Sequence, residues 1–338
     1  MDPLQSELGE LPADGPAPAH QDLRALAAGD RVECSYVVRD RSRRPTKRGG
    51  EWLRLVLADR TATVVAKSWD DVEQRFAIAE PATVVRIVGR FESSPQWGDA
   101  LIVEEIAPAV TGDYDPANLL ASSPLPIERM EADLAALIET IQNENLRTLL
   151  IRLIAPGGTL WERFREAPAA KHYHQAYRHG LLEHTLSVAQ GVSAAASFFP
   201  GIDRDVAVTG ALLHDIGKLE AYNDNPLAID MTDLGRLIGE IPLGYYRVRR
   251  EIDAIDGFDP ELGRAVLHII LAHHGTLEHG SPVTPATREA TLVHMMDNLG
   301  GKLGSFDRIE RTLAAGEAWS GFDRGIDGSA YFRDRQAA

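Results

Sequence analysis

The chain has 338 residues, of which 44% are hydrophobic and 25% charged, an ordinary globular composition with enough length for two domains. Its formal net charge of -15 argues against a protein that coats nucleic acid with its whole surface, because phosphate binding needs local Lys and Arg. No run reaches the roughly 18 consecutive apolar residues of a membrane span, and the N-terminus has no basic stretch followed by an apolar one. We therefore expect a cytoplasmic protein without a membrane partner.

The single cysteine, Cys34, narrows the metal chemistry open to the chain. One thiol can form neither an internal disulfide nor a Cys-based zinc cluster. Any metal must therefore be held by imidazole and carboxylate groups.

The first part of the chain is expected to be a small barrel preceded by a flexible leader. Residues 1–22 are rich in Pro, Ala, Gly and acidic side chains without periodicity, which is typical of a leader. A five-stranded β-barrel is predicted over residues 23–111, because five stretches rich in β-branched and aromatic residues alternate there with turn residues. These stretches are residues 31–40, 51–60, 61–69, 82–91 and 100–106.

A basic cluster stands out from the acidic background after the first expected strand. Six cations fall within ten residues: Arg39, Arg41, Arg43, Arg44, Lys47 and Arg48. A charge run alone favours a solvated loop. We expect these residues to project from the barrel as a long loop between its first two strands.

The second half of the chain is expected to be all helical. Residues 112–126 are punctuated by Pro, Ser and Asp and are predicted to be a linker. Apolar residues at helical spacing then predict a helical bundle over 127–315, followed by a C-terminal tail at 316–338. Helix starts are expected at Asp259 and Thr284, each followed by a proline. The fold class is therefore multidomain α+β.

Ionisable residues interrupt the apolar faces of these expected helices. Each continues a stripe of buried residues or directly follows a residue that does. The residues are His184, His214, Asp215, His273, His274 and Asp297. The core of the helical half is therefore expected to contain a polar centre.

Such a centre needs compensating charge. Burying an unpartnered polar group costs about 1 to 3 kcal/mol, so six would cost about 6 to 18, comparable to the roughly 5 to 15 kcal/mol stability of a domain. Several His with Asp and no thiolate suit Mn²⁺, Fe²⁺, Zn²⁺ or Co²⁺ better than Ca²⁺. Any one of these residues alone is better explained as an unrelated core or surface side chain. The adjacent pairs His214-Asp215 and His273-His274, on separate expected helices, favour a metal site.

The same residues carry a resemblance to a known family. His184, His214-Asp215 and Asp297 resemble the H…HD…D signature of HD-domain phosphohydrolases, and HDIGK at 214–218 is a typical form of it. Longer segments are similar to the YhaM-type 3'-5' exoribonucleases: HQAYRHGLLEHTLSVA (174–189), AHHGTLEHGSPVTPATREA (272–290) and MMDNLGGKL (295–303). LADRTATVVAKSWDD (57–71) resembles the OB-fold that this family carries before its HD domain.

The resemblance implies an OB-like barrel followed by an all-α HD-domain bundle with two divalent metal ions. Mn²⁺ is favoured, and Co²⁺, Fe²⁺, Mg²⁺ and Zn²⁺ are alternatives. The implied ligands are His184, His214, Asp215 and Asp297, with Glu240, His273 and His274 completing the second metal. Asp215 and Lys218 are the expected catalytic residues, although a plain surface lysine fits the position of Lys218 equally well.

The chain departs from the family at two positions. In LIGEIPLG, Glu240 stands where the family usually has a histidine after a glycine, and a carboxylate can still bind a metal. Gly300 stands where the family often carries a second acid, so a role for that acid does not transfer to this chain.

The barrel is expected to bind a single strand. OB-folds stack bases on aromatic rings above a basic groove, and each stacked base contributes about 1 to 3 kcal/mol. Trp97, beside Gly98 in an expected turn, is the preferred stacking residue, whereas Trp69 at a strand end is expected to pack inside. The expected nucleic-acid contacts are Arg43, Arg44, Lys47, Arg48 and Trp97.

The resemblance thus implies a metal-dependent 3'-5' exonuclease that degrades single-stranded RNA, and by extension DNA, to 5'-mononucleotides. Two alternatives stay open. The first is an HD-type nucleotide or cyclic-nucleotide phosphohydrolase, since HD domains serve several reactions. The second, motivated by Glu240 and Gly300, is a nucleic-acid-binding protein with a degenerate HD site. Assembly into a homo-oligomer is left open.

Overall fold

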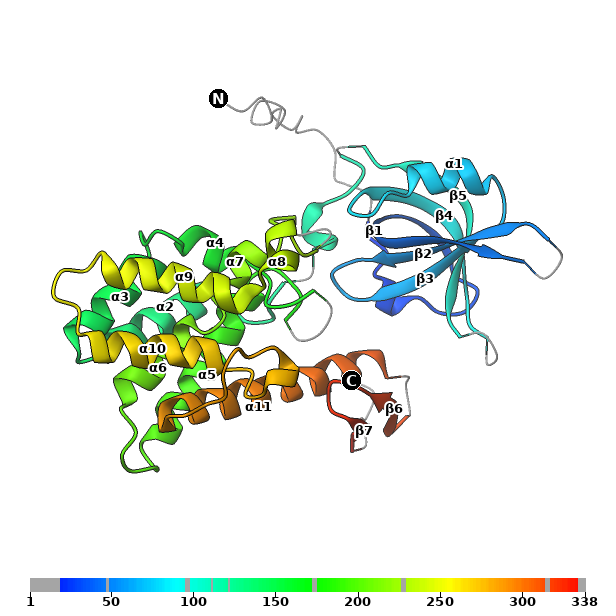
Figure 1. Ribbon diagram of the computed structural model, residues 1–338. Helices are drawn as coiled ribbons and strands as arrows, with labels where there is room; N and C mark the ends of the chain where they lie inside the picture. The colour runs from blue at the N-terminus through cyan, green and yellow to red at the C-terminus, as the bar shows by residue number, and fades with distance from the viewer. Residues whose placement is uncertain are drawn as a thin grey trace, which may run out of the picture. The chain divides into compact units, whose positions relative to one another are not determined.

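The chain divides into two compact units, Met1–Ala121 and Ser122–Ala338. The computed structural model describes residues 19–46, 49–94, 98–110, 112–120, 122–171, 175–225, 229–313 and 317–333 (Figure 1). Most of the expected leader, and with it residues 1–18, lies outside the described residues. The domain boundaries expected from the sequence stay a prediction.

The first unit is a closed barrel with strand order β1-β2-β3-β5-β4 (Figure 1). Its strands pair antiparallel except for β3 and β5, which pair parallel. This order, with a helix between β3 and β4, is that of an OB-fold and confirms the predicted fold class. The elements are a short helix at Leu23–Ala25, β1 Arg31–Pro45, β2 Glu51–Ala58, β3 Thr63–Ser68, α1 Val72–Ile78, β4 Val84–Glu92, β5 Ala100–Pro108 and a short helix at Pro116–Asn118.

Alternation along β2 separates the inside of the barrel from its outer face. Leu53, Leu55 and Leu57 are fully buried in the barrel core. Because successive strand residues point to opposite faces, Trp52 and Arg54 point outward. The outer face of β2 is therefore available for other contacts.

The basic cluster is not the loop that the sequence analysis expects. β1 continues to Pro45 and pairs with β2 as far as Glu51, so four of the six cations, Arg39, Arg41, Arg43 and Arg44, lie on a strand. A bulge between Val38 and Asp40 shifts the register and lets the pairing continue. Two of the expected nucleic-acid contacts in this cluster, Lys47 and Arg48, lie outside the described residues.

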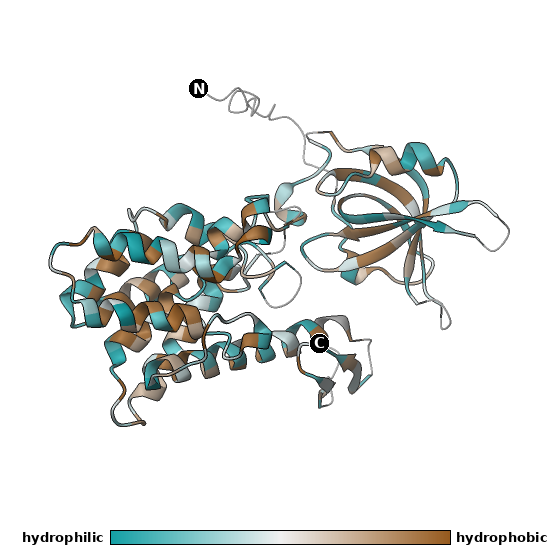
Figure 2. Cartoon of the chain, viewed as in Figure 1, coloured by the Kyte–Doolittle hydropathy of each residue, from teal (hydrophilic) through white to brown (hydrophobic). Residues whose placement is uncertain are grey.

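The second unit is helical, apart from a hairpin near its end. Figure 2 shows the apolar residues gathered between the helices of this unit. The elements are α2 Ile127–Glu139, α3 Glu144–Ile154, α4 Trp161–Glu166, α5 Gly180–Ala196, α6 Arg204–Leu213, α7 Lys218–Ala221, α8 Asp233–Leu237, α9 Glu240–Asp253, α10 Pro260–Ala272, a short helix at Leu277–His279, α11 Arg288–Thr312, β6 Trp319–Asp323 and β7 Gly328–Tyr331.

Helix ends show where the predictions for this unit hold and where they fail. Asp259 caps α10 as expected, accepting the N–H of Glu261 at 2.8 Å. Thr284 does not cap α11, because the hydroxyl of Thr287 takes that role and accepts the N–H of Ala290 at 3.1 Å. α6 ends at Leu213, so the HD pair follows the helix in a turn instead of lying within it.

The segment expected to be a tail includes the β6–β7 hairpin. The Arg308 guanidinium of α11 donates to both carboxylate oxygens of Asp323, at 2.8 and 2.9 Å. The Phe306 and Phe332 rings meet edge to face with centroids 6.3 Å apart. Figure 1 shows this hairpin beside the C-terminal part of α11. Among the described residues, no helix has both the length and the apolar character needed to cross a membrane.

The buried carboxylate of Asp59 ties the barrel's entry segment to the β2–β3 turn. It accepts the N–H of Leu23 at 2.6 Å, of Thr61 at 2.7 Å and of Ala62 at 2.9 Å. We expect Asp59→Ala to lower the opening free energy of the barrel by about 3 kcal/mol or more. The three N–H groups would lose their acceptor, and each buried unsatisfied group costs about 1 to 3 kcal/mol.

Amide hydrogen exchange over β1 to β5 in the full chain measures this change. Asp59→Asn keeps an acceptor oxygen and should lose less, and the exposed Asp70→Ala is the matched control. Unchanged exchange in Asp59→Ala would contradict the assignment.

Candidate functional site

Four residues from three parts of the helical unit converge at one buried point. His184 comes from α5, His214 and Asp215 from the turn after α6, and Asp297 from α11. The Nε2 atom of His184 lies 3.4 Å from Asp215 Oδ2 and 3.1 Å from Asp297 Oδ1. The Nε2 atom of His214 lies 3.3 and 3.7 Å from the same two oxygens. The arrangement brings together the residues of the H…HD…D pattern.

A second group extends this cluster toward the surface. The Nε2 atom of His273, at the end of α10, lies 3.6 Å from Asp215 Oδ1. His274 packs against His273 with ring centroids 4.4 Å apart, and its Nε2 lies 3.8 Å from Glu240 Oε1. His273 is fully buried, whereas the side chains of His274 and Glu240 are 27% and 25% exposed. The expected ligands therefore form a buried set and a rim pair.

The orientation of two imidazoles fixes what their inner nitrogens can do. The Nδ1–H of His214 donates to Ala211 O, and that of His273 donates to Ile270 O, both at 2.7 Å. In a neutral ring this leaves Nε2 with a lone pair. Neither Nε2 makes a hydrogen bond of acceptable geometry within the described part of the chain, and both face carboxylate oxygens. Acceptors facing acceptors need a positive charge between them.

The electrostatics of the cluster show the same requirement. Burial opposes a charge on His214, yet Asp215 and Asp297 outweigh it and raise the pKa of His214 to about 10. Burial also opposes ionisation of Asp215, but Lys218 and His214 hold the pKa of that carboxyl well below its usual range. The Lys218 ammonium donates to Asp215 Oδ2 at 2.7 Å. Protons and one ammonium thus supply the positive charge in the metal-free chain.

The donor set fits divalent cations of the first transition row. It contains carboxylate oxygens and imidazole nitrogens without a thiolate, and the rings of His214, His273 and His274 are held by hydrogen bonds to backbone carbonyls. Asp215 presents Oδ2 toward His184 and His214 and Oδ1 toward His273, so its two oxygens face different imidazoles. Such a carboxylate suits two neighbouring cations. His184, His214 and Asp215 offer ligand atoms within 4.8 Å of one another.

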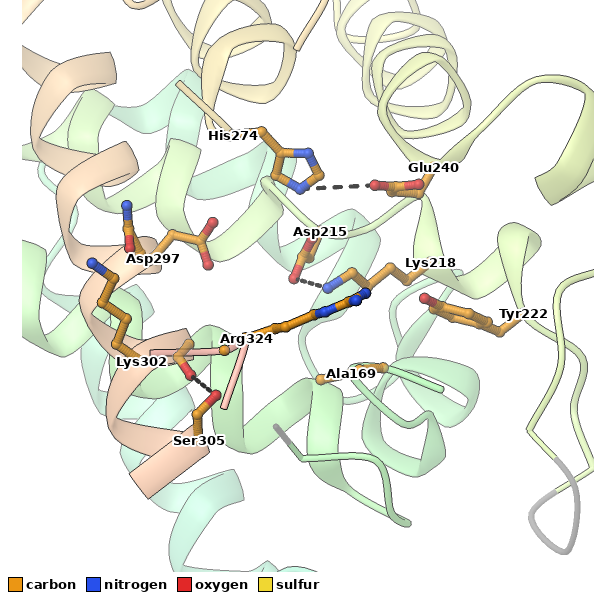
Figure 3. Close-up of a pocket in the computed structure, with 14 residues that line it drawn as sticks. Ala169, Asp215, Lys218, Tyr222, Glu240, His274, Asp297, Lys302, Ser305 and Arg324 are labelled. Carbon is orange, nitrogen blue, oxygen red and sulfur yellow. Dashed lines mark hydrogen bonds and ion pairs between the residues drawn. The ribbon is translucent and has the colours of Figure 1, made fainter. Parts of the chain in front are cut away.

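The cluster opens into a cavity of about 440 Å³. Figure 3 shows Asp215, Lys218 and Asp297 on its wall with the rim pair His274 and Glu240. Lys218 also lines the cavity. Further lining residues that the sequence analysis does not identify are Tyr222, Lys302, Ser305 and Arg324. Lys302 falls within the MMDNLGGKL segment (295–303), and no motif marks the other three.

Gly217 explains why the turn after α6 can lie against α9. A Cβ atom at this position would sit 1.9 Å from the carbonyl oxygen of Glu240 and 2.5 Å from the nitrogen of Gly244. Only glycine allows this approach, which brings the start of α9 and its Glu240 next to the HD pair. At Gly300 of α11, an added Cβ would be 3.9 Å from the His184 ring.

The barrel carries a stacked pair of tryptophans on its outer face. Trp52 of β2 and Trp69 after β3 have ring centroids 6.0 Å apart and planes inclined by 23°. Trp69 is 50% exposed, so the expectation that it packs inside is wrong. The reason is register, because Leu53 pairs with Ser68 and the next residues outward are the two tryptophans.

Three basic residues lie on the same face of the barrel as this tryptophan pair. Arg44 lies directly opposite Trp52 across the β1–β2 ladder, and Arg54 lies opposite Lys67 across β2–β3. Directly opposed residues of antiparallel strands share a face, so Arg44, Arg54 and Lys67 belong to the face of the tryptophans. The result is an aromatic and basic surface on an acidic chain.

The other residues expected to contact nucleic acid do not belong to this surface of the described barrel. Arg43 lies over the Phe76 ring of α1 at 4.5 Å and forms an ion pair with Glu51 at 3.9 Å. Its side chain therefore packs toward α1 and not toward the tryptophan pair. Trp97 lies outside the described residues. Two further aromatics of the barrel, Tyr36 and Phe91, are buried in its core.

Comparisons with known proteins agree with the fold. A model of the HD domain matches residues 181–301. The chain is 28% identical over 292 residues to a protein of Bacillus licheniformis named 3'-5' exoribonuclease YhaM, covering 86% of this chain and 90% of that protein. The protein of the same name in Bacillus subtilis strain 168 is 27% identical with the same coverage.

Solved structures of OB-fold proteins resemble a part of the chain. The second OB-fold domain of replication protein A from Methanococcus maripaludis is 14% identical, covers 27% of this chain and 94% of its own, and has a TM-score of 0.22. The fold assignment rests on the strand order of the barrel, not on this score. The chain is an HD-domain, metal-dependent hydrolase with an OB-fold barrel, similar over most of its length to the YhaM-type 3'-5' exoribonucleases.

Proposed function

We propose that the chain is a metal-dependent 3'-5' exonuclease that hydrolyses single-stranded RNA to 5'-mononucleotides. The observation that carries the proposal is the buried convergence of imidazole and carboxylate acceptors at the wall of a cavity. The relatives named 3'-5' exoribonuclease support the direction of attack and the choice of RNA. Single-stranded DNA is included, because base stacking does not distinguish the sugars.

The residues that would hold the metals are those of the cluster. His184, His214, Asp215 and Asp297 form the inner set, and His273, His274 and Glu240 extend it to the rim. Two bound divalent ions would supply a water of lowered pKa and neutralise the leaving oxygen of a phosphodiester. Mn²⁺ is the ion that we favour for this donor set.

The protein side chains would then position the metal ions and the phosphate. Asp215 faces imidazoles with both oxygens and fixes the geometry of the centre. Lys218 holds a proton firmly, because Asp215 outweighs the burial that opposes its charge and raises the pKa of Lys218. Its ammonium can therefore neutralise a phosphate oxygen in the cavity. No side-chain nucleophile is needed.

The barrel would hold the strand. Stacked bases need aromatic faces with cations nearby for the phosphates, and Trp52 and Trp69 with Arg44 offer both. Stacking accepts every base, which suits an enzyme that removes one nucleotide after another. The barrel thus contributes affinity and the helical unit contributes the reaction.

Replacing Asp215 tests the proposal directly. With Mn²⁺ and a labelled oligoribonucleotide, we expect Asp215→Asn to lower kcat by on the order of 10³-fold or more, because the centre loses the charge that holds its cations. Oligonucleotide binding should be retained and metal content should fall. Asp256→Asn, an exposed acid outside the cavity, is the control.

Products separate the alternatives. Release of 5'-mononucleotides supports the exonuclease, and hydrolysis of small nucleotides alone supports a nucleotide phosphohydrolase. Binding without cleavage or metal would identify a degenerate site.

Metal affinity should depend on pH. His214 has a pKa of about 10 in the metal-free chain, so at neutral pH it carries a proton that a metal must displace from Nε2. Because this pKa is raised, the competing proton is lost only as pH increases. The apparent association constant for Mn²⁺ should therefore rise about tenfold per pH unit for each proton displaced.

Calorimetry between pH 6 and 8, in buffers of different ionisation enthalpy, measures both the affinity and the protons released. The exposed His279→Ala is the control and should retain this dependence. A pH-independent affinity without proton release would rule out His214 as a ligand.

Strand binding should depend on the tryptophan pair. We expect Trp69→Ala to weaken binding of a single-stranded oligonucleotide by about 5- to 150-fold, from the loss of about 1 to 3 kcal/mol of stacking. Metal content should not change. Fluorescence anisotropy measures the affinity. Phe198→Ala, which removes an exposed aromatic just beyond the end of α5, is the control. Equal affinities would remove the pair from the binding surface.

A further inference from the structure

The β6–β7 hairpin is fastened to α11 at a defined place. Asp323, the last residue of β6, accepts two hydrogen bonds from Arg308 and a third from the N–H of Gly325 at 2.8 Å. Arg308 and the hydrogen bond of Gly325 hold the pKa of Asp323 below its usual range despite partial burial. Ala330 of β7 is buried, and its N–H donates to Ser320 Oγ at 2.8 Å. The hairpin is therefore held to α11 by Arg308 and held together by the bonds of Asp323 and Ser320.

The turn lies close against α11. A Cβ atom at Gly325 would be 2.5 Å from Ser305 Oγ and 3.1 Å from Ser305 Cβ, so the small glycine allows the turn to lie this close to α11. Arg324 lies between the fastened Asp323 and this glycine. Both Arg324 and Gly325 line the cavity that holds Asp215 and Asp297. Figure 3 shows the Arg324 side chain extending over the same cavity as Asp215 and Lys218.

The charge of Arg324 has no acidic counterpart in the described chain. No ion pair joins it to any residue that the structure describes, although the surface is rich in carboxylates. Lys218, in contrast, is bound to Asp215 at the buried end of the cavity. An exposed guanidinium at the rim, with five donors in a planar fork, matches the oxygens of a phosphate.

We propose that the hairpin is part of the substrate site and that Arg324 binds the phosphate next to the scissile one in a single-stranded nucleic acid. The proposal rests on the function proposed above. Lys218 serves the phosphate at the metals, and Arg324, at the rim, serves the following phosphate. The enzyme thereby distinguishes a polynucleotide from a substrate with a single phosphodiester.

Binding of a labelled single-stranded oligoribonucleotide in EDTA tests the inference without turnover. We expect Arg324→Ala to weaken binding about tenfold and to lower the slope of log affinity against log salt by about 0.7, the value for one phosphate contact on a single strand. Arg324→Lys keeps the charge without the fork and should restore the slope and part of the affinity. Arg333→Ala removes an exposed cation just beyond β7, outside the cavity, and should match wild type.

Activity assays separate this inference from the proposed function. In Mn²⁺, Arg324→Ala should raise KM for the oligonucleotide about tenfold and leave hydrolysis of bis(p-nitrophenyl) phosphate and metal content unchanged. Wild-type affinity and salt slope in Arg324→Ala would overturn the role of Arg324, whatever the activity. Absence of oligonucleotide cleavage by wild type, with the small diester still hydrolysed, would overturn the proposed function instead.

Discussion

The helical unit depends on one electrostatic conflict at its centre. His214 and His273 donate Nδ1–H to backbone carbonyls, so their Nε2 lone pairs point at the carboxylate oxygens of Asp215. Such a meeting of acceptors is stable only with positive charge between them, whether protons, an ammonium or metal ions. Gly217 lets the turn after α6 lie against the start of α9, next to these residues. A metal centre is the chemical use that best explains it.

The two units divide the work that a nuclease needs. The helical unit concentrates acids and imidazoles where metal ions can bind, and Lys218, Lys302 and Arg324 line the same cavity. The barrel fills its interior with leucines and leaves Trp52 and Trp69 outside with cations around them. An acidic chain can thus bind a polyanion, because the positive charge is local.

Periodicity and motif predicted much of this structure, and packing decided the rest. The five strands and the convergence of His184, His214, Asp215 and Asp297 follow from patterns within short stretches. The turn that follows α6 lies against α9 in a contact between distant parts of the chain, and the exposure of Trp69 depends on cross-strand register. Neither is written in the local sequence.

The contact between Lys218 and Asp215 has a consequence for the order of events in the life of the protein. The ammonium occupies the oxygen that the first cation would claim, and it neutralises a buried acid that would otherwise oppose folding. The buried acid therefore has a cationic partner within the chain itself. Cations bound by Asp215 would take over this neutralisation and leave the Lys218 ammonium for an anionic substrate, so one event would both complete the centre and prepare the cavity.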